Sequence, residues 1–365
     1  MKIALVNTIK PVAGSGNGVV EYAHQLYEHI RRGNDVDVVY ALGSPKRNNL
    51  PGLIYTNTLF RSRVKRLISG DYDIVHITDQ EIGFVARMLH GNTRAKVITT
   101  VHDFARFSKS MHRGLLQKGY SALVKRNVKS ALEFSDAILF DSRQMIDEVK
   151  SMFWLPRKYR VINLGVKDSV LQRKPAHDRR GGHDKEFRIG YIGSFSHHKN
   201  VIMILKAAEI LKGRGAYRFL VYGTGSRYKA LSDYKSMHGL KNVEFMGFAQ
   251  ESRIAQIYDS FDVYMHPVLY TGFELEILEA QARGLPVIIY KYGKIPEEVT
   301  KYCLKAENAE DAARIIRDLK EHGYDEKLKK RATAYARSFR WSKTAEATLG
   351  VYKELLRTSQ RAKQG

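Results

Sequence analysis

The sequence predicts an α/β protein with two domains, each built on a doubly wound parallel sheet. A chain of 365 residues is too long for one ordinary hydrophobic core. Short apolar runs rich in β-branched residues alternate with longer stretches of helical period, which is typical of parallel strands joined by crossover helices. This alternation occurs twice. We therefore expect one domain over residues 1–171 and a second over residues 187–341.

The first domain is predicted from its apolar runs. The expected strands are Lys2–Asn7, Asp35–Ala41, Ile74–Ile77, Ala95–Val101, Ala137–Asp141 and Arg160–Asn163. Between the first two strands, the stretch Val19–Arg32 carries apolar side chains at helical spacing, such as Val20, Ala23 and Leu26. The first domain is thus one complete α/β unit.

A charged segment separates the two sets of strands. Residues 172–186 contain Pro175 and a glycine pair and lack any apolar period, so we expect an exposed linker there. The strands expected after it are Phe187–Ile192, Tyr217–Tyr222, Val243–Met246, Val263–His266, Pro286–Tyr290 and Thr300–Leu304. A last amphipathic helix, residues 342–360, is expected to pack back on the first domain.

The charge balance predicts attraction to phosphate-rich surfaces. The chain has 61 basic and 38 acidic residues, a formal charge of +23. No zinc-finger, RRM or KH signature accompanies this charge, so we expect no nucleic-acid partner. Basic residues and apolar residues at helical spacing coincide in Leu59–Ile68 and Phe107–Lys129. These segments indicate either docking to an anionic membrane surface or ordinary exposed helix faces.

The expected location is the cytoplasm, with a possible peripheral position on the inner face of the membrane. A single cysteine, Cys303, excludes an intrachain disulfide and fits a reducing compartment. No apolar stretch approaches the roughly 20 residues of a membrane-spanning helix. The opening residues MKIALVN are typical of a buried first strand rather than a signal peptide.

Two glycine-rich turns are candidate phosphate sites. Gly14, Gly16 and Gly18 lie between the first strand and a helix, where backbone N–H groups can bind an oxyanion. Their spacing does not match the dinucleotide fingerprint, and a simple tight turn is the alternative. The second turn, Gly193–Asn200, includes Lys199 at the expected start of a helix. A lysine there adds a full charge to the helix dipole, which suits a diphosphate, although Lys199 alone could also be a solvated surface residue.

The stretch Pro267–Val287 carries the third candidate. A loop with Gly272 opens an amphipathic helix on which Glu276 and Glu279 lie three residues apart. A buried carboxylate at Glu279 would accept two hydroxyl hydrogen bonds from a ribose. Acidic residues near a helix start are also common for dipole reasons alone.

Taken in order, the motifs of this chain resemble those of glycosyltransferase family 4, retaining enzymes of the GT-B fold in which two Rossmann-like domains face each other across a cleft. The resemblance covers nearly the full length and rests on eleven short motifs. They are Gly14 to Gly18, Val101-His102-Asp103, Phe140-Asp141-Ser142, Val161 to Val166, Gly193 with Lys199-Asn200, Tyr222 to Gly225, Val243 to Gly247, Asp262 to Pro267, Gly272 to Leu275, Glu279-Ala280 and Gly284 to Val287.

The resemblance implies a role for each matching position. Lys199 would hold the donor diphosphate, Glu279 the ribose and the backbone around Phe245 the base, with His102 near the transferred sugar. The implied donor-binding residues are Gly16, Gly193, Ser194, Lys199, Gly223, Phe245, Thr271, Gly272, Phe273, Leu275, Glu276, Ile277 and Glu279. The implied catalytic residues are His102, Lys199, Glu274 and Glu279. The donor would be a UDP- or GDP-sugar, the acceptor a glycan or lipid-linked molecule, and no metal or other cofactor is expected.

Two positions depart from the family pattern. Thr271 stands where the family usually has a glutamate, and Ser194 stands where it usually has an arginine. Glu274, where many relatives have glycine, would partly replace the lost glutamate. Without the arginine, Lys199 would carry more of the diphosphate charge. The sequence therefore predicts either an unusual sugar specificity or a catalytically weakened protein that binds sugar nucleotides.

Overall fold

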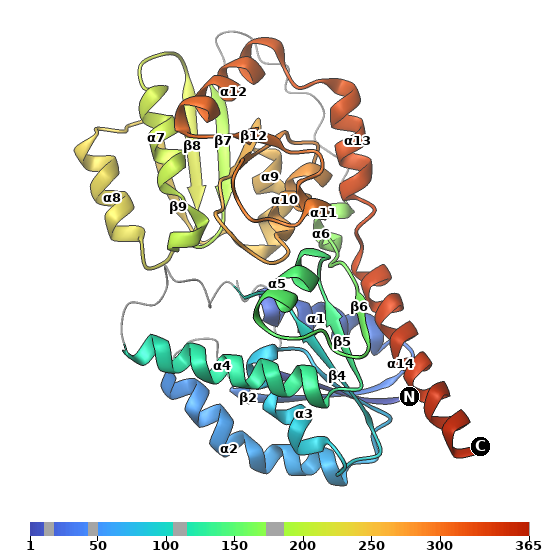
Figure 1. Ribbon diagram of the computed structural model, residues 1–365. Coiled ribbons are helices and arrows are strands. Elements are labelled where there is room, and N and C mark those ends of the chain that lie inside the picture. Colours follow the sequence, from blue (N-terminus) through green and yellow to red (C-terminus); the bar gives the residue numbers. More distant parts are fainter. Residues whose placement is uncertain (11–17, 43–49, 105–114, 173–185, 365) are drawn as a thin grey trace. The chain divides into compact units, whose positions relative to one another are not determined.

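The computed structural model describes residues 1–10, 18–42, 50–104, 115–172 and 186–364. The chain forms two compact units (Figure 1). The first unit contains residues Met1–Gly165 and Trp341–Gly365, and the second contains Val166–Arg340.

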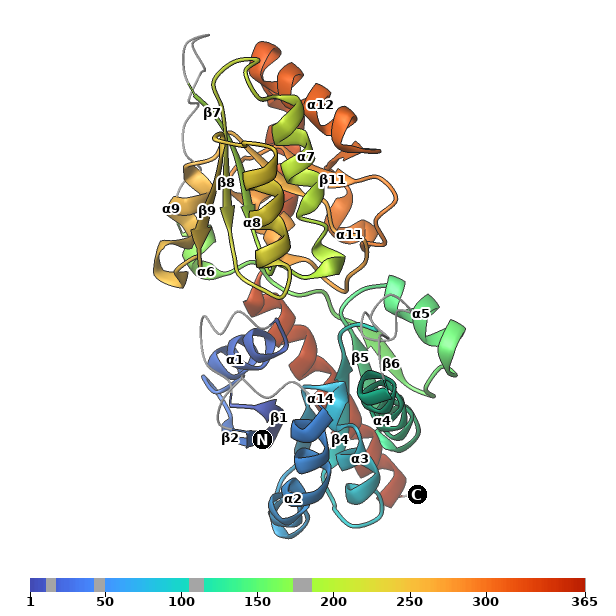
Figure 2. The same ribbon diagram turned by 90° about the vertical axis from the view of Figure 1, so that its left-hand side faces the viewer.

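The first unit is a six-stranded parallel sheet in the order β2-β1-β3-β4-β5-β6. Its strands are β1 (Lys2–Ile9), β2 (Asp35–Leu42), β3 (Ile74–Ile77), β4 (Lys96–Val101), β5 (Ala137–Phe140) and β6 (Tyr159–Val161). Its α-helices are α1 (Gly18–Ile30), α2 (Leu50–Ser69), α3 (Phe84–Leu89), α4 (Leu115–Phe134), α5 (Gln144–Met152) and α14 (Trp341–Gln364). Helices α2, α3 and α4 pack against one another, and α1 packs against α14 (Figure 2).

The second unit is also a six-stranded parallel sheet, in the order β12-β11-β10-β7-β8-β9. Its strands are β7 (Phe187–Ile192), β8 (Tyr217–Tyr222), β9 (Val243–Gly247), β10 (Val263–His266), β11 (Val287–Tyr290) and β12 (Leu304–Ala306). Its α-helices are α6 (Asp168–Leu171), α7 (Ile202–Ile210), α8 (Tyr228–Met237), α9 (Ile254–Asp259), α10 (Leu275–Ala282), α11 (Glu297–Thr300), α12 (Ala309–His322) and α13 (Glu326–Ala336).

The strand order places a topological switch point in the second unit. The chain adds β8 and β9 on one side of β7 and then returns to add β10 on its other side. Loops leaving the carboxyl ends of β7 and β10 therefore diverge, and such crevices bind ligands in open α/β sheets. The glycine turn after β7 and the stretch after β10 both begin at this point.

Three details differ from the expected organisation. The expected strand Thr300–Leu304 is instead the end of α11 followed by a turn, because the acidic pair after Pro296 starts a helix, and β12 begins only at Leu304. Residues 166–171 belong to the second unit, since Val170 and Leu171 are buried in its core. Lys199 lies in a 3₁₀ turn (η5, His197–Lys199) rather than at the start of α7, which begins at Ile202. The expected linker falls mostly outside the described residues.

Helix α14 is fixed to the first unit by a buried polar network. The Tyr352 hydroxyl lies 2.6 Å from Nδ1 of His76, and Nε2 of His76 lies 2.7 Å from the Thr100 hydroxyl. Burial, helped by the nearby His102, lowers the pKa of His76 to about 3, so this imidazole is neutral. The C-terminal helix thus completes the core of the first unit.

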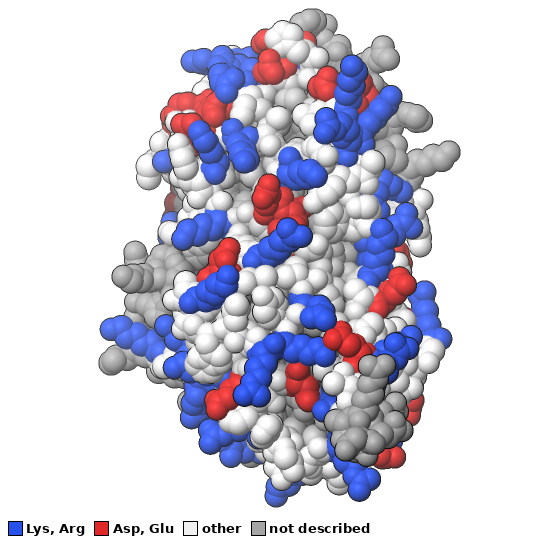
Figure 3. Space-filling view, turned by 45° about the vertical axis from the view of Figure 1, so that its right-hand side comes forward, with Lys and Arg blue, Asp and Glu red and all other residues white. Residues whose placement is uncertain are grey.

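The basic helices of the first unit bury their apolar sides. In α2, Val64 and Leu67 are buried while Arg61 and Arg66 are exposed. In α4, the buried residues are Val124, Val128 and Leu132, and the exposed basic residues are Lys118, Lys125, Arg126 and Lys129. Because the apolar residues pack inward, the exposed faces of α2 and α4 are positively charged rather than apolar. They could attract a membrane by charge but would not insert an apolar stripe into it. On the face drawn in Figure 3, basic side chains lie scattered among acidic and uncharged ones. Within the described ranges, every helix is too short or too polar to span a bilayer.

Candidate functional site

Backbone hydrogen bonds join the loops that follow β7, β8 and β9. The Gly193 amide donates to the Tyr222 carbonyl at 3.1 Å, and the Gly223 amide donates to the Gly247 carbonyl at 2.7 Å. A Cβ atom on Gly223 would lie 1.8 Å from the Gly193 carbonyl oxygen, and its φ of 144° also favours glycine. The glycines that the sequence singled out in these loops thus permit close backbone packing beside the switch point.

Lys199 is turned toward the start of α10. Its Nζ lies 2.7 and 2.6 Å from the two carboxylate oxygens of Glu274. The two side chains are only 11% and 5% exposed, so this is a buried ion pair. The lysine predicted to hold a diphosphate therefore has an internal anionic partner.

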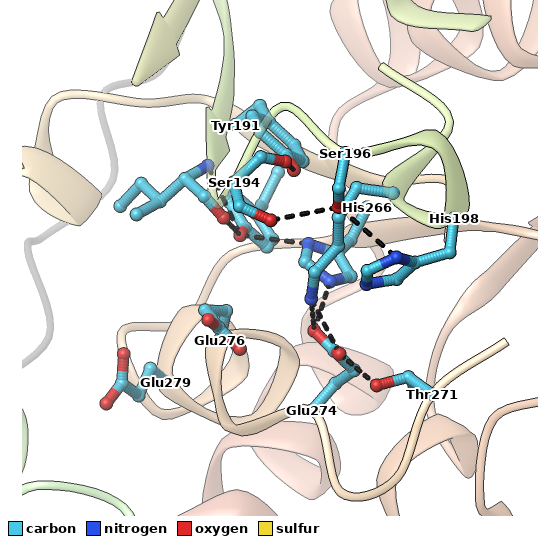
Figure 4. Close-up of polar contacts among 12 residues, drawn as sticks. Tyr191, Ser194, Ser196, His198, His266, Thr271, Glu274, Glu276 and Glu279 are labelled. Carbon is cyan, nitrogen blue, oxygen red and sulfur yellow. Dashed lines mark hydrogen bonds and ion pairs between the residues drawn. The ribbon is translucent and has the colours of Figure 1, made fainter. Parts of the chain in front are cut away.

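Glu274 has three polar partners. Besides Lys199, it is bonded to Nε2 of His266 at 2.7 Å and accepts a hydrogen bond from the Thr271 hydroxyl (Figure 4). Burial alone would raise the pKa of Glu274, but Lys199 and His266 hold it well below its usual range. Glu274 is therefore ionised at neutral pH. We call Lys199, His266, Thr271 and Glu274 the Glu274 cluster.

His266 is itself held rigidly. Its Nδ1 lies 3.1 Å from the Tyr264 hydroxyl, which donates to the Ile192 carbonyl at 2.9 Å. The Tyr191 ring stacks on the His266 ring with centroids 5.7 Å apart. Tyr264 and His266 lie in one of the eleven motifs, but no supporting role was predicted for them. Their signal was the i, i+2 spacing of Tyr264 and His266, which places both on one face at the carboxyl end of a strand.

Glu279 lies one turn into α10 and is buried, with 3% exposure. Its Oε2 accepts a hydrogen bond from the Tyr258 hydroxyl at 3.0 Å, while Oε1 is buried and has no hydrogen-bond partner among the described residues. Burial raises the pKa of Glu279 to about 7. An unsatisfied buried acceptor is costly, so this oxygen is suited to a hydroxyl donor from a ligand.

The predicted base-binding residue Phe245 lies in an aromatic cluster. Its ring centroid is 5.7 Å from that of Phe195 and 5.6 Å from that of Tyr228. Phe195 is fully buried, whereas Tyr228 is 46% exposed. This cluster joins the loop after β7, the start of α8 and β9.

The remaining predicted donor-binding residues differ in how much surface they expose. Ser194 is exposed, and its hydroxyl lies 3.0 Å from that of Ser196. Ile277 is fully buried in the core, so its side chain cannot cover a ligand. Gly272 is buried, and the half-buried residues are Gly193, Gly223, Phe273, Leu275 and Glu276. Gly16 lies outside the described residues.

His102 belongs to the first unit. Its Nδ1 lies 2.6 Å from an Asp141 carboxylate oxygen, and its Nε2 lies 2.9 Å from the Thr78 carbonyl oxygen. Burial would lower the pKa of His102, but the charge of Asp141 and these hydrogen bonds raise it to about 9. His102 is therefore a buried imidazolium at neutral pH, and both ring N–H groups are in use.

One group of described residues has the composition of a metal site. Potential ligand atoms of His266, Glu274 and Glu276 lie within 4.8 Å of one another. In this structure His266 and Glu274 are bonded to each other, and Lys199 binds the same carboxylate. The cation next to Glu274 is thus a lysine, and independence from metal stays a prediction.

Comparison with known proteins identifies the family. Residues 16–170 match the family model described as Glycosyltransferase Family 4, and residues 186–322 match the one described as Glycosyl transferases group 1. An uncharacterised glycosyltransferase of Methanocaldococcus jannaschii is 26% identical and is matched over 97% of this chain and 98% of its own. The O-antigen chain mannosyltransferase B of Escherichia coli is 27% identical over 45% of each chain.

Solved structures share the fold. Sucrose-phosphate synthase from Thermosynechococcus elongatus superposes with a TM-score of 0.79 at 19% identity, over 98% of this chain and 100% of its own. HepE of Anabaena, solved with UDP and glucose, has a TM-score of 0.72 at 15% identity over 97% of this chain and 100% of its own. WaaG, a glycosyltransferase involved in lipopolysaccharide biosynthesis, has a TM-score of 0.70 at 13% identity over 96% of this chain and 99% of its own. The chain therefore has the GT-B fold and belongs to the family 4, group 1 glycosyltransferases.

Proposed function

We propose that this protein transfers a sugar, with retention at the anomeric carbon, from a UDP- or GDP-sugar to a glycan or to a lipid- or polyprenyl-linked acceptor. The observation that carries the proposal is the buried carboxylate of Glu279 in α10, one oxygen of which has no partner among the described residues. Glu274, which pairs with Lys199, precedes the first residue of the same helix. A ribose would supply hydroxyl donors to Glu279, and a diphosphate would supply anionic oxygens to Lys199. The UDP named with the HepE structures supports a nucleotide ligand.

The proposed chemistry needs charge stabilisation more than a covalent nucleophile. As the bond between the sugar and the diphosphate breaks, negative charge builds up on the phosphate oxygens. Lys199 and the backbone N–H groups of the β7 and β8 loops would stabilise that charge without a metal. Glu274 is held by three partners and is therefore a poor candidate for a nucleophile. By family resemblance, His102 would lie near the transferred sugar.

A second candidate function is nucleotide-sugar binding with little turnover. Ser194 adds no charge to the site, and Lys199 is already neutralised by Glu274. A diphosphate would therefore meet less positive charge than at a site with a free lysine and an arginine.

Nucleotide release separates the two functions. The purified protein would be incubated with UDP-, GDP- and ADP-sugars, and free nucleotide measured over time. Release with one donor, abolished in Lys199→Ala, supports the transferase. Measurable nucleotide binding without release from any donor would favour the binding protein.

We also propose a peripheral, cytoplasmic position at an anionic membrane. The support is the set of exposed basic side chains on α2 and α4, which an anionic head group would attract. Such a position would bring a lipid-linked acceptor to the first unit.

A further inference from the structure

The lysine of the proposed diphosphate site is not available in the free protein. Its Nζ forms two short bonds with Glu274, and both side chains are almost completely buried. The Lys199 ammonium has three N–H donors, and Glu274 takes two of them. A diphosphate that binds through more than one of these donors must therefore displace Glu274 from at least one. Glu274 and a diphosphate are therefore competitors for one cation.

We propose that Glu274 determines specificity by making the site prefer an intact nucleotide sugar over a free nucleoside diphosphate. This inference rests on the proposed function, in which Lys199 holds the donor diphosphate. Glu274 acts through Lys199 and also offers its own oxygens to the sugar. The chemical class it selects is a diphosphate that carries a hydroxylated group.

The carboxylate stays in place when the lysine moves. Glu274 keeps its bonds to His266 and Thr271, and His266 is fixed by Tyr264 and by the stacked ring of Tyr191. Lys199, in contrast, has a flexible four-carbon side chain that can swing toward a phosphate. Ligand binding therefore leaves a fixed, buried carboxylate that has lost its strongest partner.

The cost of that loss depends on the ligand. A buried charge deprived of its ion-pair partner is strongly destabilised unless new hydrogen-bond donors reach it. In a nucleotide sugar, the sugar is bonded directly to the phosphate that Lys199 would hold, so its hydroxyl groups lie close to Glu274 and can donate to it. A free nucleoside diphosphate has no such donors. It therefore bears the full cost of separating Lys199 from Glu274.

This arrangement also affects product release. Once the sugar has been transferred, the nucleoside diphosphate no longer offers hydroxyl donors to Glu274. Lys199 then returns to Glu274, and binding of the nucleoside diphosphate product becomes weaker. The same contact that slows entry of a free diphosphate would speed its departure.

The test compares binding of UDP, GDP and their glucose and mannose conjugates by isothermal titration calorimetry. Glu274→Gln removes the competing charge, so we expect it to tighten binding of the nucleoside diphosphate by about tenfold. Binding of the sugar conjugate should tighten less or weaken, so the preference for the conjugate should shrink. Unchanged or weaker binding of the free diphosphate would overturn the proposal, because Glu274 would then only hold Lys199 in position.

Controls separate the possible outcomes. Glu307→Gln removes a carboxylate from an exposed ion pair, 2.6 Å from Lys291, and should leave all affinities unchanged. If Glu274→Gln shows no cooperative melting transition, Glu274→Gly replaces it, with the same expected result. If binding of the free nucleoside diphosphate is lost in Lys199→Ala but is not tightened in either Glu274 variant, this inference is contradicted and the proposed function is not. Absence of nucleotide binding in wild type and all variants contradicts the proposed function as well.

Discussion

The Glu279→Gln variant should gain stability relative to the wild type as the pH rises from 5 to 8. Burial raises the pKa of Glu279 from 4.5 to about 7 in the folded protein. Between these two values the folded state keeps a proton that the unfolded state releases. The folded wild type therefore loses stability as the pH rises through this window, and glutamine, which does not titrate, avoids that loss.

The size of the effect follows from the pKa shift. At about 1.4 kcal/mol per pKa unit, a shift to about 7 corresponds to about 3 kcal/mol once the pH is above 7. Part of this loss in unfolding free energy has already occurred at pH 5. The difference in unfolding free energy between variant and wild type should thus grow by about 2–3 kcal/mol from pH 5 to pH 8.

Urea denaturation followed by circular dichroism at both pH values measures this difference. Any constant cost of placing an amide beside Tyr258 cancels, because only the change with pH is compared. Glu307→Gln, at an exposed carboxylate, is the matched control and should show no such change. An offset for Glu279→Gln that is equal at pH 5 and pH 8 would refute the reasoning, since Glu279 would then be ionised throughout.

Three further predictions follow from the site and the surface. UDP binding should strengthen from pH 6 to pH 8 and release up to one proton, because ribose hydroxyls favour the ionised form of Glu279. Calorimetry in buffers of different ionisation enthalpy should show this proton release in the wild type but not in Glu279→Gln. Asp141→Asn should lower the unfolding free energy at pH 6 by about 3 kcal/mol, because it removes the charge that keeps the buried His102 protonated in the folded state. That deficit should shrink as the pH rises through about 9, where His102 loses its proton, and a deficit independent of pH would count against the ion pair. Liposome binding should require anionic lipid and fade with added salt. Equal binding to neutral vesicles would argue against a role for the basic faces of α2 and α4.

Much of the fold was predictable because the strands are continuous buried apolar runs. Such runs were recognised as β7, β8 and β10 with their observed boundaries. The error at residues 300–304 arose where β-branched and aromatic residues suggested a strand but Pro296 and the following acidic residues start a short helix. There, a helix start marked by Pro296 and two acidic residues in the first turn outweighs strand propensity.

The site was predictable as a set of positions but not as a set of contacts. Lys199 and Glu279 were singled out by their positions near expected helix starts, and Glu274 by the family resemblance. These positions gave no indication that Glu274 would bind Lys199, because 75 residues separate them and only the β7 and β10 loops bring them together. No role was predicted for His266, which lies in one of the eleven motifs and whose buried ring links Glu274 to the end of β7.

Titration of UDP and GDP into wild type, Lys199→Ala and Glu279→Ala tests the central claim most directly. The account predicts that wild type binds at least one of the two nucleotides and that each substitution weakens binding by about tenfold or more while the circular dichroism spectrum is unchanged. Wild-type affinity in both variants would show that Lys199 and Glu279 do not hold the nucleotide and would contradict the account.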